Sequence, residues 1–224
     1  MLRCPLDSVK PPAFAWQSRR NPHRMATRNT APDDLRQRIL NTARTLLDEQ
    51  GAAALSLREV ARRAGVTHQA PYHHFSDRES ILAELVAQGF LELERRLAQA
   101  HSAGHSPQHT LAASGMAYVG FALDHPGVFR VMFRADLCDT GRFPPAQAAG
   151  ARAHGELLRL VRLVHGGVED PALAAMHWAQ VHGLAGLLVD GPLGQHLPGQ
   201  PERLAFAREA TALYAQQVLG RDLR

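Results

Sequence analysis

The spacing of the apolar residues constrains this chain most, because they recur every three or four positions from about residue 30 to residue 219. That period puts apolar side chains on one face of an α-helix. Glycine and proline interrupt it, for example at Gly51, Gly65, Pro126 and Gly191, and such residues typically end or begin helices. No run alternates with the strand period between hairpin turns. The pattern therefore predicts an all-α protein.

The interruptions also give approximate helix bounds. The predicted helices cover residues 30–50, 56–65, 67–75, 76–101, 108–124, 126–135, 145–165, 171–190 and 201–219. Two of them open with a capping box, in which the first and fourth side chains each satisfy a free backbone N–H of the other. These boxes are Ser56 to Glu59 and Ser76 to Glu79.

The charge of the chain is concentrated in its first residues. The net charge is +4, and five basic residues against one acidic residue before Met25 account for all of it (five minus one is four). Charge alone therefore does not predict that the folded part binds nucleic acid. We expect a poorly ordered tail over 1–29, a small DNA-binding domain over 30–76, and a larger ligand-binding and dimerisation domain over 77–224. Met25 could be the natural start, or the tail could be a basic arm that touches DNA.

Several classes of protein do not fit the sequence. Cys4 and Cys138 are too far apart in sequence for a CxxC metal site or a disulfide framework. The histidines at 101, 105 and 109 have helical spacing, but a glycine and a proline interrupt it, so we expect no metal and no cofactor. We find no P-loop, HExxH, GxSxG or GxGxxG motif. A membrane helix and a secretory signal are not expected either, which leaves the cytoplasm as the predicted location.

The segment from Ser56 to Phe75 reads SLREVARRAGVTHQAPYHHF. A helix, a glycine turn and a second short helix are typical of a helix-turn-helix, whose second helix enters the major groove of DNA. Apolar side chains at 57, 60, 61, 66 and 75 can pack inward. The polar residues Thr67, His68, Gln69, Tyr72 and His73 are then left on the short helix, which we expect to be an exposed surface.

This segment and its surroundings resemble the TetR family of transcriptional regulators over about residues 33–86. The residues that carry the resemblance are Ser56, Leu57, Arg58, Val60, Ala61, Ala64, Gly65, Val66, Thr67, Tyr72, His74, Phe75, Arg78, Glu79, Ile81 and Leu82. Pro71 departs from the family's usual apolar residue, although a first helical turn tolerates its missing N–H.

The resemblance implies contacts with DNA. Gln69 and Ala70 would face base edges, where glutamine can read adenine and alanine can touch a thymine methyl. Thr67, Tyr72, His73 and Arg78 would reach phosphates, and Tyr72 and His73 could instead reach adjacent base edges. His68 belongs to the same polar surface. His74 would bind phosphate or backbone, and the role of Arg58 stays open between DNA contact and a solvated charge.

The C-terminal two-thirds resembles a TetR subset that carries a Trp-His-Gly signature, here Trp178, His182 and Gly183. In that subset the last two long helices pair with their copies in a homodimer, which suits a palindromic operator. The expected interface residues are Leu173, Met176, Leu184, Leu187, Leu188, Leu204, Leu213 and Tyr214, with an ordinary intrachain core as the alternative.

The resemblance also implies a pocket for a small-molecule effector between the middle helices. Its candidate residues are Met116, Phe121, Phe129, Met132, Phe133, Trp178 and His182, with Tyr118 and His177 beside them. Composition favours an apolar or aromatic ligand. The sequence thus predicts a DNA-binding regulator, a repressor that its effector releases. The alternatives are a ligand-responsive activator, an all-helical enzyme without a recognisable motif, and a protein-interaction module.

Overall fold

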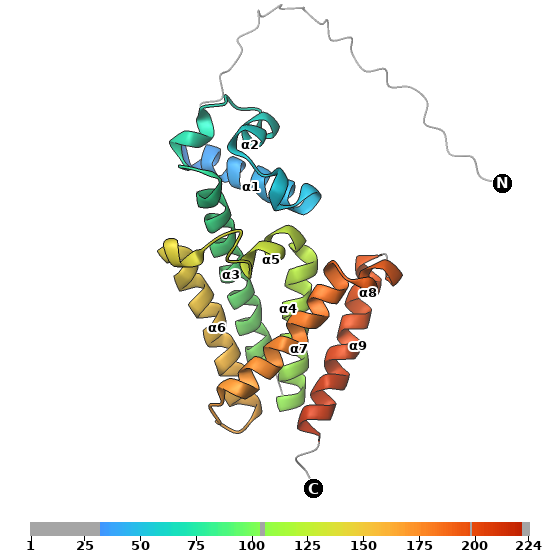
Figure 1. Cartoon of the computed structure of the whole chain (residues 1–224). Coiled ribbons are helices and arrows are strands. Elements are labelled where there is room, and N and C mark those ends of the chain that lie inside the picture. Colours follow the sequence, from blue (N-terminus) through green and yellow to red (C-terminus); the bar gives the residue numbers. More distant parts are fainter. Residues whose placement is uncertain (1–31, 104–105, 198, 221–224) are drawn as a thin grey trace, which may run out of the picture.

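The computed structural model describes residues 32–103, 106–197 and 199–220, and every regular element in these ranges is helical (Figure 1). The predicted all-α class is therefore confirmed. The α-helices are α1 (Pro32–Gln50), α2 (Leu57–Ala64), α3 (Arg78–Ala103), α4 (Pro107–Asp124), α5 (Pro126–Met132), α6 (Pro144–Val164), α7 (Pro171–Val189), α8 (Pro192–His196) and α9 (Gln200–Leu219). Short 3₁₀ turns cover Ala52–Ala54, Ala70–His73 and Thr140–Arg142. The predictions for the tail, Met25, Cys4 and His105 fall outside the described residues.

The N-terminal unit packs α1 and α2 onto the first turns of α3. Figure 1 shows this unit at one end of the molecule, with α3 running from it into the larger helical unit. Its core consists of fully buried side chains that the helical period placed on inner faces: Ile39, Leu40, Leu46, Val60, Ile81 and Leu82. One long helix thus serves both units.

The ends of α2 follow the sequence signals, with one correction. The Ser56 hydroxyl accepts a hydrogen bond from the Glu59 N–H at 3.1 Å. The reciprocal half of the predicted capping box is not made, because arginines bind the Glu59 carboxylate instead. Gly65 ends the helix at φ 66°, a left-handed conformation that glycine adopts without steric cost.

The second predicted capping box lies one residue further along the chain. Asp77, rather than Ser76, caps α3, and its carboxylate accepts from the Ser80 N–H at 2.8 Å. The Ser80 hydroxyl accepts in return from the Asp77 N–H at 3.3 Å. The α3 helix therefore begins at Arg78.

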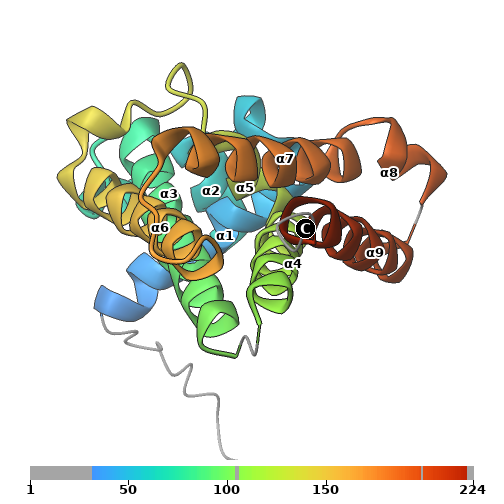
Figure 2. The same ribbon diagram turned by 90° about the horizontal axis from the view of Figure 1, so that it is seen from below.

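The larger unit is built from two helix pairs and a crossing helix. Figure 2 shows α6 beside α3 and α9 beside α4, with α7 crossing between the pairs. Phe121, Val119 and Leu188 are fully buried at the centre of this arrangement. By length and composition alone, α7 reaches the threshold for a membrane-spanning helix, with a mean hydropathy of 1.3 over an 18-residue window. Core helices of soluble proteins pass the same test.

A close contact joins the two units. Gly127, at the start of α5, lies against the end of α1, and a Cβ there would come 2.6 Å from the Asp48 backbone nitrogen. The Gly127 N–H donates to the Asp48 carboxylate at 2.7 Å. Only glycine allows this approach of two backbones.

Candidate functional site

The segment after α2 is a compact exposed turn rather than the predicted helix over 67–75. Its regular part is the 3₁₀ turn Ala70–His73. The N–H groups of both His74 and Phe75 donate to the Pro71 carbonyl, at 3.0 and 2.9 Å. The proline ring restricts the backbone at this position. The two hydrogen bonds to its carbonyl close the turn.

Two buried side chains anchor this turn to the N-terminal core. Pro71 is buried, and Phe75 is only 4% exposed. The Arg36 guanidinium lies 5.3 Å from the centre of the Phe75 ring. The turn is therefore held from below while its other face stays open to solvent.

The open face carries the polar residues that the sequence singled out. Thr67, His68, Gln69, Tyr72 and His73 are exposed. Ala70 and His74 are half-buried. The His68 and Tyr72 rings lie 5.7 Å apart. The exposed polar side chains of this segment therefore share one surface. Residues 67–74, which carry it, form the recognition turn.

Arg78 and Arg58 differ in their surroundings. The Arg78 guanidinium donates to the carbonyl oxygens of Leu55 at 3.1 Å and Ala52 at 2.8 Å. These bonds tie the start of α3 to the loop before α2, so the structure gives Arg78 a structural role beside the predicted phosphate contact. Arg58 is exposed, and it borders the same shallow hollow as His68.

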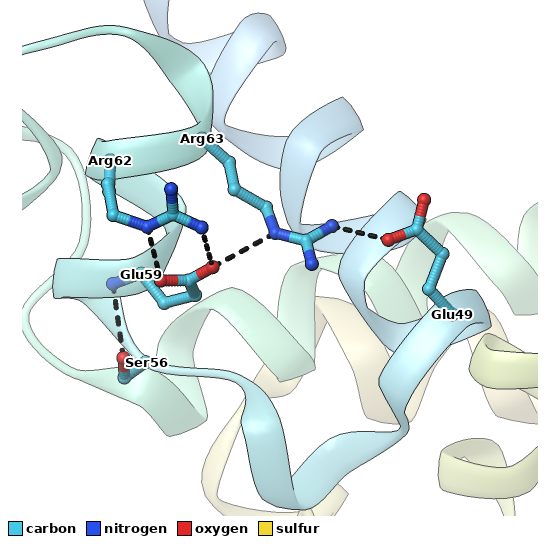
Figure 3. Close-up of polar contacts among 5 residues, drawn as sticks. All are labelled: Glu49, Ser56, Glu59, Arg62 and Arg63. Atoms are coloured by element: carbon cyan, nitrogen blue, oxygen red, sulfur yellow. Dashed lines mark hydrogen bonds and ion pairs between the residues drawn. The ribbon is translucent and has the colours of Figure 1, made fainter.

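A charged network stiffens α2 behind the recognition turn. Arg62 forms a two-pronged ion pair with Glu59 at 2.8 and 2.6 Å, and Arg63 bridges Glu59 to Glu49 at the end of α1 (Figure 3). Hydrogen bonds from Arg62 and then Arg63 lower the pKa of Glu59 to about 2. Both arginines are thus paired with carboxylates.

A cavity of about 310 Å³ lies within the larger unit. Its wall comes from α3, α4, α6, α7 and α9, together with Phe133 and Thr140. The residues are Phe90, Leu93, Leu97, Leu111, Ser114, Gly115, Tyr118, Phe133, Thr140, Ala146, Gln147, Gly150, Ala153, His154, Leu157, Leu160, His177, Trp178, Gln180, Val181, Thr211 and Tyr214. The volume is within the range of small-molecule sites, which starts at about 300 Å³.

The predicted pocket residues divide between this wall and the core. Phe133 and Trp178 line the cavity, as do their neighbours Tyr118 and His177. Phe121, Phe129 and Met132 are buried core residues instead, and Met116 packs against that core. His182 lies behind the wall, where its ring contacts the rings of Phe133 and Trp178. These five assignments to the pocket wall are corrected by the packing.

The sequence reasoning missed the contribution of α3 and α6. Ala146, Gly150, Ala153 and Leu157 line the cavity from one face of α6. The sequence contains this three- and four-residue spacing, but small residues on a helix face are as typical of close helix packing as of a cavity. Only the distance to the facing helix distinguishes close packing from a cavity.

Hydrogen bonds to two histidine rings, those of His177 and His182, position the polar side chains in and behind the cavity wall. The Tyr118 hydroxyl bonds to His182 Nδ1 at 2.8 Å and accepts from the Trp178 indole N–H at 3.2 Å. His177 bonds to the Tyr214 hydroxyl and to His165, both at 2.9 Å. Burial, and next the nearby His165, lower the pKa of His177 to about 4, so this ring is neutral at pH 7.

The predicted dimer residues also divide. Met176, Leu187 and Leu213 are exposed, and Leu173, Leu204 and Tyr214 are partly buried. Leu184 and Leu188 face the intrachain core, with 8% and 0% exposure, so they are wrongly assigned to an interface. Tyr214 is turned toward the cavity by its bond to His177.

Comparisons with known proteins place both units. Residues 39–85 match the family described as bacterial regulatory proteins of the tetR family. Residues 111–213 match the family described as the tetracyclin repressor-like C-terminal domain. An uncharacterized HTH-type transcriptional regulator of Haemophilus influenzae is 31% identical over 100 residues, which cover 45% of this chain and 49% of that protein. The match thus spans about half the length of this curated relative.

Solved structures agree on the fold. A Rhodococcus sp. RHA1 protein of unknown function is 28% identical, with a TM-score of 0.69, over 88% of this chain and all of that one. The TetR family transcriptional regulator PfmR of Thermus thermophilus is 21% identical, with a TM-score of 0.61, over 84% of this chain and all of that one. The second likeness concerns the fold alone.

Proposed function

The chain belongs to the TetR family of transcriptional regulators, and from this premise we propose that it is a homodimeric repressor that a small molecule releases from its operator. DNA binding is the property it shares with the family. The dimer, the effector and the repressor role are parts of the proposal. The Trp-His-Gly subset stays a prediction.

One observation carries the proposal: the recognition turn exposes Thr67, Gln69 and Tyr72 while Pro71 and Phe75 anchor it from below. Exposed polar side chains on a rigid support are suited to reading base edges and phosphates. We infer that Gln69 and Ala70 face the bases, and that Thr67, His68, Tyr72, His73, His74 and Arg58 surround them.

A second copy of the chain would cover the exposed apolar face of α7 and α9. Met176 is 62% exposed and Leu213 is 51% exposed, and only 28% of the apolar window of α7 is buried. Exposed apolar surface of this extent favours association. A two-fold dimer places two recognition turns on one palindromic site.

The cavity and the contact at Gly127 suggest how an effector would act. Phe133, which follows α5, lines the cavity, and α5 touches α1 through Gly127. A ligand that prefers one position of α5 would shift the N-terminal unit relative to its copy. Its differential affinity for the two arrangements lowers DNA affinity, and a coupling of about 1 to 3 kcal/mol is typical.

Binding-site selection with the purified full-length chain tests the proposal, and the Gln69→Ala variant tests the reading of bases. We expect a palindromic site, at which Gln69→Ala loses about 1 to 3 kcal/mol of preference at one base pair of each half-site. Gln195→Ala, an exposed change on α8, is the matched control. Equal losses on operator and random DNA would refute base reading by Gln69.

A further inference from the structure

We propose that the cavity takes an elongated, uncharged and largely apolar molecule whose polar atoms are those of hydroxyl groups. This inference rests on the proposed function, in which the same cavity is the effector site. It adds the shape and the charge of the ligand, which the fold does not specify.

The shape follows from the run of lining residues along α6. They extend from Ala146 to Leu160, a rise of about 21 Å at 1.5 Å per residue. The cavity volume of about 310 Å³ is only twice that of the roughly 150 Å³ cavity that holds benzene. A space of this volume spread along four turns of a helix is long and narrow, so a compact molecule would leave much of it empty.

Small residues on α6 open this channel opposite larger apolar residues on α3. Ala146 and Ala153 are buried and line the cavity. A Cβ at Gly150 would come 3.5 Å from the Phe90 ring, which is ordinary contact. Because Ala153 lines the cavity, a larger side chain at this position would extend into the channel.

The charge of the ligand follows from the residues of the wall, which include no Asp, Glu, Lys or Arg in the described part of the chain. The Glu156 carboxylate on α6 bonds to His101 at 2.8 Å and to Arg159 at 3.4 Å. No buried side-chain nitrogen or oxygen among the described residues lacks a hydrogen-bond partner. An ionic ligand would thus lose its hydration without meeting a carboxylate, ammonium or guanidinium group, and the ionisable rings in the wall are those of His154 and His177, besides the phenols of Tyr118 and Tyr214.

The wall carries several hydroxyl and amide groups, and two of its hydroxyl groups bond to histidine rings. Ser114 bonds to His101 Nε2 at 3.2 Å, and Tyr214 bonds to His177 Nδ1 at 2.9 Å. Both residues line the cavity. A hydroxyl group has one donor and two acceptor positions, so each keeps capacity for at least one more bond. His101 Nδ1 donates to the Glu156 carboxylate, so the Ser114 hydroxyl donates to His101 Nε2 and can only accept from a ligand. A hydroxyl group of the ligand, which can donate as well as accept, matches that capacity.

The test uses four probes, each with ten carbon atoms, and the fluorescence of Trp178, which lines the cavity. The full-length chain carries Trp16→Phe, because Trp16 is the other tryptophan. Decan-1-ol, decanoate and decylammonium differ only in the head group, and 1-adamantanol is neutral but compact. We expect decan-1-ol to bind at least tenfold more tightly than each of the other three.

Ala153→Leu should weaken decan-1-ol binding at least tenfold, whereas Ala151→Leu, an exposed site on the same helix, should not change it. If Ala153→Leu does not fold, the melting temperature of the Trp16→Phe chain tests the inference instead. This temperature should rise when decan-1-ol is added and should not rise with decanoate or decylammonium. The inference is overturned if decanoate, decylammonium or 1-adamantanol binds as tightly as decan-1-ol or more tightly. It is also overturned if folded Ala153→Leu binds decan-1-ol with unchanged affinity.

The outcomes separate this inference from the proposed function, because ligand binding is measured without DNA. If decan-1-ol binds as expected but does not weaken the operator complex, the proposed release is wrong and the ligand class stands. If decanoate binds more tightly and releases the operator, the ligand class is wrong and the proposed function stands.

Discussion

The side chains in and beside the recognition turn have two kinds of role: some are buried or half-buried and anchor the turn, and others are exposed on its surface. Pro71 and Phe75 are buried below the turn, and Gln69 and Tyr72 are exposed on it. Arg78 belongs to the first group, since two backbone carbonyls accept its hydrogen bonds. The family pattern includes Tyr72, Phe75 and Arg78 alike, so only their contacts separate support from recognition.

Arg78→Ala should lower the free energy of unfolding by about 1 to 3 kcal/mol, because two half-buried carbonyl oxygens lose a charged donor. Urea denaturation measures this loss. Arg58→Ala is the control, since Arg58 is exposed and no described residue bonds to its side chain; it should change stability by less than about 0.5 kcal/mol. Weakened DNA binding with unchanged stability in Arg78→Ala would instead favour the phosphate contact.

Two helices approach each other backbone to backbone where the two units join. The start of α5 packs onto the end of α1 through Gly127, whose N–H bonds to Asp48. Because Gly127 has no side chain, the backbones of the two units come into contact there.

Gly127→Ala should destabilise the chain by about 1 to 3 kcal/mol, because the new Cβ would lie 2.6 Å from the Asp48 backbone nitrogen. Thermal denaturation measures the change. Gly155→Ala on α6 is a matched control with no heavy atom within 4 Å of the new Cβ, and its better helix propensity should stabilise by up to about 1 kcal/mol. Similar effects of both variants would contradict the close contact.

The contact of α7 with α9 should make stability depend on pH. Burial, followed by His165, lowers the pKa of His177 from 6.5 to about 4. Between these values the unfolded chain binds more protons, so the free energy of unfolding should fall as the pH drops from 6.5 to 4. His177→Gln keeps a hydrogen-bonding side chain that does not titrate. Its stability should fall less between pH 7 and pH 5 in urea denaturation, and a loss equal to that of the unchanged chain would refute the assignment.

At the scale of the whole molecule, exposed apolar side chains lie on α7 and α9 in the described part of the chain. Met176 and Leu187 on α7 and Phe206 and Leu213 on α9 are all more than a third exposed. Elsewhere in the described part of the larger unit most large apolar side chains are buried, although Leu91, Leu163 and Val168 are exposed. In the proposed dimer, a second copy would cover the surface on α7 and α9.

Met176→Glu should convert the proposed dimer to a monomer, because a carboxylate would be buried there without a partner. Size-exclusion chromatography with light scattering measures the mass. Leu163→Glu is the matched control on α6, where the leucine is 45% exposed, and it should remain a dimer. A monomeric unchanged chain, or a dimeric Met176→Glu, would show that the interface lies elsewhere.

Local sequence signals predicted most of the long helices, because apolar period, caps and glycine stops act within a few neighbouring residues. Ser56, Gly65 and the stripe from Ile81 to Leu93 are examples, whereas the predicted helix over 67–75 is a 3₁₀ turn. Which faces are buried depends on the packing of distant helices. The mostly apolar sequence of α7 does not reveal that Leu188 is buried and Met176 exposed, and alanines on α6 do not reveal a cavity. Both depend on the distance to helices far away in the chain, which no local pattern encodes.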